Sequence, residues 1–195
     1  MISRIKGVLL HREGSRVEVE TRGGLVYEVE VPLTVAERLP SQGSDLELRT
    51  VYVVREDSAS LFGFLAPEER TLFLRVMEAS GVGARLALAM LSTLPARRLA
   101  RALADKEVTV LTQVPGVGKK KAERIVLELS DKVDDLAARA AVDGRPGTDG
   151  AEEAVRALVA LGYSHQEADR AVREVLAKGA VDGTDELIRR ALAHD

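Results

Sequence analysis

The chain has 195 residues, of which 46% are hydrophobic and 30% charged, and its formal net charge is −3 at pH 7. This balance is typical of a folded globular protein and argues against a disordered chain. The absence of cysteine excludes disulfides, iron–sulfur clusters and thiolate nucleophiles. The three histidines, His11, His165 and His194, lack the spacing of metal ligands. We therefore expect no metal and no cofactor.

The composition also limits where and on what the protein acts. Its first residues carry charges where a signal peptide has an apolar core, and no apolar run is long enough to cross a membrane. We therefore expect a cytoplasmic protein with no membrane partner. Aromatic residues make up only 3% of the chain, which disfavours single-strand binding barrels and base-flipping enzymes because both stack bases on aromatic rings.

The first 64 residues are predicted to form a small β-barrel. Apolar and polar residues alternate along three stretches, at 17–20, 27–31 and 46–54, and residues 60–64 are expected to form a closing strand. A short helix is expected at 35–39. Five strands and one small helix in residues 1–64 suit a closed barrel of the oligonucleotide/oligosaccharide-binding (OB) fold.

The next segment, residues 65–141, is predicted to be all helical. Its five expected helices span 67–78, 84–91, 95–104, 107–112 and 119–130. It is also the one basic segment, because it holds 13 basic and 10 acidic residues, whereas residues 1–64 hold 8 and 10 and residues 142–195 hold 7 and 11. This distribution favours an anionic partner for the helical segment.

A flexible linker and a small helical domain complete the predicted α+β multidomain architecture. Residues 142–150 contain three Gly and one Pro and are expected to be the linker. Residues 151–195 show a three-helix pattern. Its expected N-caps are Asp149 and Ser164, each followed three residues later by Glu, and Thr184.

An internal repeat is the most informative feature of the helical segment. The sequence from Ser80 to Ala87 recurs 35 residues later, from Pro115 to Ala122, and each copy holds Gly-Val-Gly between two expected helices. Glycine permits positive φ and close backbone approach, and the N–H groups at the start of the following helix bind anions. The repeat predicts two phosphate-binding helix–hairpin–helix turns. The candidate DNA-binding residues are Gly81, Val82, Gly83, Ala84 and Arg85 in the first hairpin, and Gly116, Val117, Gly118, Lys119, Lys120, Lys121 and Arg124 in the second.

Two other glycine motifs can be excluded. A dinucleotide-binding fingerprint needs a third glycine where Leu86 and Lys121 stand, and it needs a strand before the turn. A Walker A loop needs Gly at Gln113 and Ser or Thr at Lys120. The chain therefore does not bind ATP by that route.

The whole chain resembles the RuvA family, the bacterial subunits that bind Holliday junctions for branch migration. The resemblance rests on the domain order and on five stretches, at residues 52–57, 61–64, 80–83, 115–120 and 160–163. It implies a non-catalytic homotetramer that holds a four-way junction open and planar, as one tetramer or as two facing tetramers, in recombination and DNA repair. Each pair of hairpins would grip one duplex arm through its backbone.

The resemblance also implies roles for particular residues. Glu56 and Asp57 match the acidic pin near the junction centre, which would repel uninterrupted duplex; without the resemblance they would be an ordinary polar turn. The three-helix tail resembles ubiquitin-associated (UBA) domains and would dock the hexameric RuvB ATPase, with Leu158, Leu161, Gly162 and Tyr163 as candidate contacts. The RuvC resolvase would join the same complex. One departure is Ser80, where many such hairpins carry Pro; with Arg85 as its only nearby cation, the first hairpin is expected to bind DNA more weakly.

Other functions remain open at this point. A helix–hairpin–helix DNA glycosylase would need a catalytic acid, for which Asp131, Asp134 and Asp135 stand downstream of the second hairpin. The low aromatic content and the duplicated motif disfavour it. A protein adaptor would leave the basic repeat unexplained, whereas a generic DNA-backbone binder would retain it.

Overall fold

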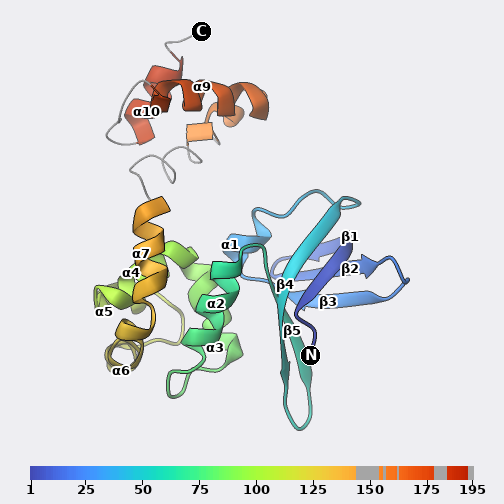
Figure 1. The fold of residues 1–195 in the computed structure, drawn as a ribbon, viewed down its shortest axis with the longest axis vertical. Coiled ribbons are helices and arrows are strands. Elements are labelled where there is room, and N and C mark those ends of the chain that lie inside the picture. Colours follow the sequence, from blue (N-terminus) through green and yellow to red (C-terminus); the bar gives the residue numbers. More distant parts are fainter. Residues whose placement is uncertain (144–153, 156, 162, 178–183, 193–195) are drawn as a thin grey trace. The chain divides into compact units, whose positions relative to one another are not determined.

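The computed structural model describes residues 1–143, 154–155, 157–161, 163–177 and 184–192 (Figure 1). The chain divides into two compact units, Met1–Ala137 and Ala138–Asp195. The first unit contains a β-barrel and a helical region, and the second contains the C-terminal helices.

The N-terminal strands close into the predicted five-stranded barrel. Its strands are β1 (Arg4–Glu13), β2 (Arg16–Thr21), β3 (Val26–Glu30), β4 (Asp45–Val54) and β5 (Ala59–Phe64). They follow the order β1-β2-β3-β5-β4, and β4 pairs with β1 to close the barrel. All pairs are antiparallel except β3 with β5. The alternating apolar side chains, such as Val17, Val19 and Leu48, point inward and are almost fully buried, as expected for half-buried strands.

The small helix of the barrel begins earlier than predicted. It is α1 (Leu33–Ala36), whereas the sequence suggested residues 35–39. Pro32 stands at its N-cap, where a missing N–H has no cost. Pro40 disfavours helical geometry at the residue before it, Leu39, which explains the early end.

The helical region matches the predicted spans closely. Its helices are α2 (Pro67–Val76), α3 (Ala84–Thr93), α4 (Ala96–Ala104), α5 (Val108–Leu111) and α6 (Lys119–Leu129). A 3₁₀ turn, η1 (Ser130–Lys132), follows, and then α7 (Asp134–Asp143), which the sequence analysis did not predict. The end of α7 overlaps the first two residues assigned to the linker; residues 144–150 lie outside the described part of the chain.

The barrel and the helical region share one hydrophobic core. Phe62 and Phe64 of β5 lie against Phe73 of α2, with ring centroids 5.1 Å and 5.0 Å apart. All three rings are buried with the apolar faces of α3 and α6. Since such aromatic pairs add to the stabilisation from burial, this core fixes the helices against the barrel.

Most of the described residues of the C-terminal unit are helical. Residues 154–155 and 157–160 are helical, and α9 (His165–Ala177) and α10 (Thr184–Leu192) follow. The predicted capping box is present, because Glu167 accepts the backbone N–H of Ser164 at 3.0 Å and the N–H of Glu167 donates to the Ser164 hydroxyl at 3.3 Å. The helix α10 begins at Thr184, as predicted. The other predicted cap, Asp149, lies outside the described residues.

Candidate nucleic-acid interface

The two repeated turns have the same backbone structure. Each follows a helix, with Val82 N–H donating to the Ala79 carbonyl at 3.0 Å and Val117 N–H donating to the Val114 carbonyl at 3.0 Å. The second glycine of each turn, Gly83 or Gly118, is the N-cap of the next helix. The duplication seen in the sequence is therefore a duplication of hydrogen-bonded geometry.

The first glycine of each turn is required by its backbone. Gly81 has φ +75° and Gly116 has φ +84°, a region that costs other residues about 1 kcal/mol or more. The second glycines have extended backbones, with φ −95° at Gly83 and −82° at Gly118. A Cβ at Gly118 would meet no described atom within 4 Å, so contacts within the described chain do not demand a glycine there.

The second hairpin presents an open, positively charged helix start. No side chain caps the N-terminus of α6 among the described residues, so its first N–H groups are available to an anion. Lys119 and Lys120 are exposed beside them, and Lys121 is half-buried. Because a surface without a Cβ lets a phosphate backbone come close to these groups, Gly118 suits a site for DNA.

The first hairpin is similar but less charged. The N-terminus of α3 also lacks a side-chain cap among the described residues, and Arg85 is exposed next to it. The side chains of Val82, Ala84 and Val117 are buried in the helical core. These three predicted site residues therefore shape the turns and can offer a ligand only their backbone.

Arg124 joins the two hairpins. Its Nη2 atom donates to the carbonyl oxygen of Ser80 at 2.6 Å, and its Nε lies 3.9 Å from the carboxylate of Glu128. The Glu128 carboxylate in turn accepts the backbone N–H of Ser80 at 2.7 Å, which holds the pKa of Glu128 below its usual value. The sequence analysis placed Arg124 in the second phosphate site and did not identify Glu128.

The predicted acidic pin is the turn between β4 and β5. The β-hairpin of β4 and β5 projects beyond the barrel, and its tip lies at the same end of the first unit as the α2–α3 turn (Figure 1). Glu56 and Asp57 are exposed at the tip, where Arg55 N–H donates to the Ser58 carbonyl at 2.8 Å. The Arg55 guanidinium lies 3.5 Å from the position of a Cβ on Gly83, so the base of the pin touches the first hairpin.

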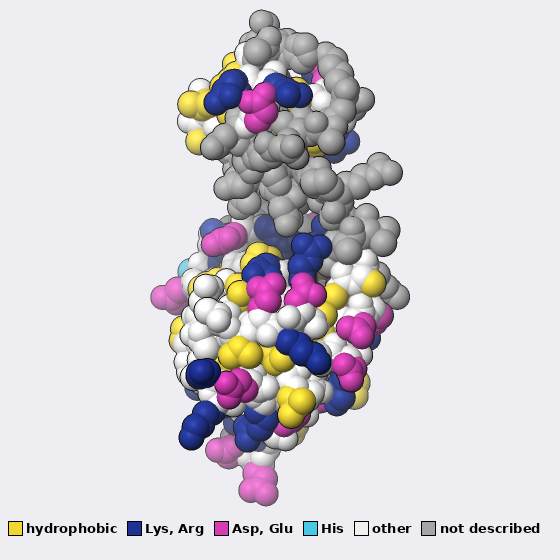
Figure 2. Space-filling view, turned by 90° about the vertical axis from the view of Figure 1, so that its left-hand side faces the viewer, with side chains coloured by type: hydrophobic (Ala, Val, Ile, Leu, Met, Phe, Trp, Pro, Cys, Tyr) yellow, Lys and Arg dark blue, Asp and Glu magenta, His cyan; other side chains and the backbone are white. Residues whose placement is uncertain are grey.

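Charge of both signs gathers at this end of the molecule. Figure 2 shows acidic side chains at its lowest point and Lys and Arg side chains directly above them. The arrangement combines groups that attract phosphates with groups that repel them.

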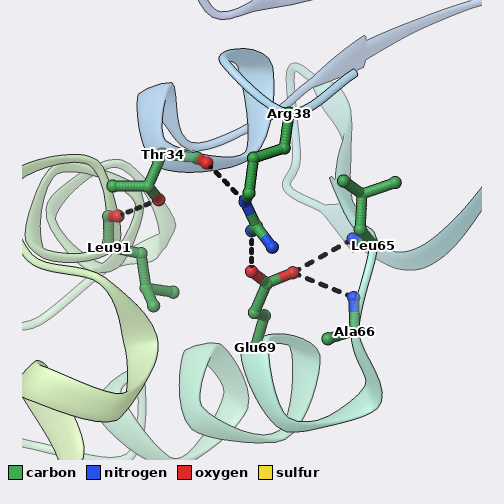
Figure 3. A network of polar contacts seen from close by, with 6 residues as sticks. All are labelled: Thr34, Arg38, Leu65, Ala66, Glu69 and Leu91. Atoms are coloured by element: carbon green, nitrogen blue, oxygen red, sulfur yellow. Dashed lines mark hydrogen bonds and ion pairs between the residues drawn. The ribbon is translucent and has the colours of Figure 1, made fainter. Parts of the chain in front are cut away.

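A polar network fixes the barrel to α2 and α3 (Figure 3). Glu69 is buried, and its Oε2 accepts the backbone N–H groups of Leu65 and Ala66 at 3.1 Å and 2.9 Å. Its Oε1 pairs with Arg38, which also donates to the Thr34 carbonyl at 2.9 Å. The Thr34 hydroxyl donates to the carbonyl of Leu91 in α3 at 2.7 Å. This network therefore connects α1 of the barrel region to the start of α2 and to α3.

Comparisons with known proteins agree with this geometry. Three family models match: "RuvA N terminal domain" at residues 1–63, "SAM-like Helix-hairpin-helix tandem" at 73–131 and "RuvA, C-terminal domain" at 149–195. A protein of Gemmatimonas aurantiaca is 48% identical over 193 residues, which cover 99% of this chain and 98% of the relative. The chain belongs to the RuvA family.

Other members of the RuvA family show the same full-length match. Relatives from Xanthomonas campestris and Xanthomonas axonopodis are 42% and 41% identical over 192 residues, covering 98% of this chain and 97% of each relative. All three relatives are named "Holliday junction branch migration complex subunit RuvA". The resemblance and the fold class predicted from the sequence are thereby confirmed.

The candidate glycosylase acids have structural partners or lie exposed. Asp135 forms a two-bond ion pair with Arg75, which holds the pKa of Asp135 below its usual value. Arg75 also donates to the carbonyl of Lys132 at 2.6 Å, so this pair attaches α7 to α2. Asp131 and Asp134 are exposed. None of the three lies in the buried setting of a typical catalytic acid.

The candidate motor contacts in the C-terminal unit differ in exposure. Leu158 is buried in the small core of this unit, and Tyr163 packs against that core. Leu161 is 63% exposed and Val159 is 40% exposed. Gly162 lies outside the described residues. Leu161 is thus the predicted contact best placed to meet a partner.

The described part of the chain contains neither a metal-binding group nor a membrane-spanning helix. Within them, no group of three or more His, Asp or Glu side chains could hold a metal ion. No helix in the same part of the chain is long and apolar enough to span a membrane.

Proposed function

We propose that this chain is a non-catalytic subunit that binds four-way DNA junctions through the phosphate backbone and supports the RuvB motor in branch migration. The observation that carries the proposal is the duplicated turn, which has the same hydrogen bonds and a positive-φ glycine in both copies. In each copy, the helix that follows the turn begins beside cationic side chains. Contacts of this kind go to phosphates and read DNA structure rather than sequence. The names of the full-length relatives supply the substrate and the complex.

The hairpin cations supply the binding energy in this proposal, and the pin supplies selectivity. Glu56 and Asp57 are exposed in the β4–β5 turn, and in this proposal continuous duplex lying across the junction centre would meet their carboxylates. Replacing them by Glu56→Gln and Asp57→Asn keeps their size and removes their charge. The double variant is expected to bind duplex more tightly and to lose junction preference; an unchanged preference would refute the pin assignment.

The test of the DNA face is the salt dependence of junction binding. The double variant Lys119→Ala, Lys120→Ala is expected to bind a four-way junction more weakly and to lower the salt slope by about 0.9 per lost phosphate contact. A matched control is Lys6→Ala with Arg22→Ala, which removes the same charge from exposed residues of the barrel. Equal slopes in the two double variants would remove the second hairpin from the interface.

The C-terminal unit is proposed to dock the motor. It follows a segment rich in Gly, and a tethered domain can reach a moving partner at high effective concentration. A chain that stops after Asp143 keeps α7 and both hairpins. It is expected to bind junctions normally and to lose stimulation of the RuvB ATPase; normal stimulation would refute this role.

The same proposal includes a homotetramer and a RuvC partner, both from the family resemblance. The barrel region leaves seven large apolar side chains exposed, and their burial between subunits would remove apolar surface from water. They are Met1, Leu10, Leu25, Val26, Leu33, Tyr52 and Val54. Mass measurement in solution is expected to give four times 21.0 kDa, or twice that for facing tetramers; a monomer would refute the assembly. RuvC is expected to bind the junction complex and not the free chain.

A further inference from the structure

The two hairpins differ at the residue before the first glycine. The second hairpin has Pro115, which carries no N–H, and the first has Ser80, which does. The two turns otherwise share their hydrogen bonds. The first turn therefore has an exposed backbone donor that the second turn lacks.

Helix α6 supplies partners for both backbone groups of Ser80. Glu128 Oε2 accepts its N–H at 2.7 Å, and Arg124 Nη2 donates to its carbonyl at 2.6 Å. The two side chains are four residues apart and therefore lie on one face of α6. Arg124 approaches so closely that a Cβ on Gly81 would lie 2.7 Å from its Nη2 atom.

The arrangement is one-sided. The repeat relates Arg124 and Glu128 of α6 to Ala89 and Thr93 of α3. Neither of these can form an ion pair or accept an N–H as a carboxylate does. The helix of the second hairpin thus holds the first turn, and the helix of the first hairpin has no equivalent pair for the second.

We propose that Arg124 and Glu128 form a clamp that sets the position of the first hairpin, so that both hairpins present their helix starts to DNA as one unit. The proposal rests on the DNA-binding function proposed above. In this role Glu128 is a positioning residue, because it acts on DNA through the turn at Ser80 and not by direct contact. Its charge alone would oppose phosphate binding.

This opposition of effects gives a sharp test. If Glu128 acted only through its charge, Glu128→Ala would tighten junction binding, as removal of any acid near a phosphate site does. If it acts as a clamp, the same change weakens binding, by about tenfold at the low end of the strength of hydrogen bonds to charged groups. The control is Glu123→Ala on the same helix, since Glu123 is exposed and makes no hydrogen bond or ion pair with other described residues.

The clamp also predicts which second change cancels the effect. Ser80→Pro removes the N–H that Glu128 accepts, and Pro115 shows that this turn accommodates proline. In the Ser80→Pro background, Glu128→Ala is expected to behave like Glu123→Ala. The variant Glu128→Gln, which keeps an acceptor oxygen, is expected to remain within about twofold of the wild type.

Amide hydrogen exchange tests the clamp without DNA. The Ser80 amide is expected to exchange faster in Glu128→Ala and at the normal rate in Glu123→Ala, in the full-length protein at matched pH. An unchanged Ser80 rate, or junction binding by Glu128→Ala as tight as that by Glu123→Ala, would overturn the clamp. Loss of binding in Lys119→Ala, Lys120→Ala would show that the DNA function stands even then, whereas failure of the wild-type chain to bind the four-way junction would overturn the function itself.

Discussion

Replacing Glu69 by Ala removes the centre of the network that joins the barrel to the helical region. The carboxylate accepts two backbone N–H groups at the start of α2 and pairs with Arg38. Hydrogen bonds to a charged group contribute about 1.5 kcal/mol each at the low end of their range. The Arg38 side chain is 46% exposed, and ion pairs of this exposure contribute about 0.5 kcal/mol. We therefore expect Glu69→Ala to lower the free energy of unfolding by about 3.5 kcal/mol.

Urea unfolding followed by circular dichroism measures this loss. Two comparisons isolate the network. Arg38→Ala leaves both N–H bonds of Glu69 in place and is expected to cost about 1 kcal/mol or less. Glu68→Ala removes the same charge from the exposed neighbouring position in the first turn of α2 and is expected to cost about 0.5 kcal/mol through the helix dipole. If Glu69→Ala lowered the free energy of unfolding no more than Glu68→Ala does, the hydrogen bonds from the backbone to Glu69 would not stabilise the contact between the barrel and the helical region. That result would refute the reasoning.

Three further predictions concern the turns, α7 and the C-terminal unit. Gly81→Ala and Gly116→Ala both place a side chain at positive φ, but only the first displaces Arg124. Gly81→Ala is therefore expected to speed hydrogen exchange of the Ser80 amide. Equal exchange rates of this amide in both variants would contradict the prediction. The Arg75 pair holds the pKa of Asp135 below its ordinary value. The pair's contribution to stability is therefore complete above the ordinary pKa and is lost as the pH falls through the lowered pKa. The urea midpoint of Asp135→Asn should lack this acid-dependent step, and an identical pH profile would argue against the pair. Leu158→Ala should lower the stability of the C-terminal unit by about 2 to 5 kcal/mol, which is seen as faster amide hydrogen exchange there. Leu161→Ala should leave amide exchange unchanged and reduce stimulation of RuvB. The opposite result would make Leu161 the core residue and Leu158 the motor contact.

Much of the fold follows from the sequence because its signals are local. Alternating residues predicted the barrel strands, and the Gly-Val-Gly repeat predicted both turns and the helices after them. The short helix begins two residues and ends three residues before its predicted bounds, next to Pro32 at its N-cap. Helix α7 was missed because its Ala-rich sequence lacks a clear apolar stripe.

The candidate site was only partly predictable, because its key contacts join residues far apart in the sequence. Ser80 and Glu128 are 48 positions apart, and no periodicity relates them. The sequence shows that Arg124 and Glu128 share one helix face, but it does not show that both side chains bind the backbone of Ser80. The burial of Val82, Ala84 and Val117 likewise depends on the tertiary core; these residues were predicted as DNA contacts from their place in the motif alone.

The central claim is that this chain selects four-way junctions by their structure. The direct measurement is a metal-free competition at physiological salt, with a four-way junction, a duplex and a single strand of matched sequence. The account predicts strong preference for the junction, with every strand intact after binding. Equal binding to all three would contradict junction selection, and base release or strand cleavage would contradict a non-catalytic role.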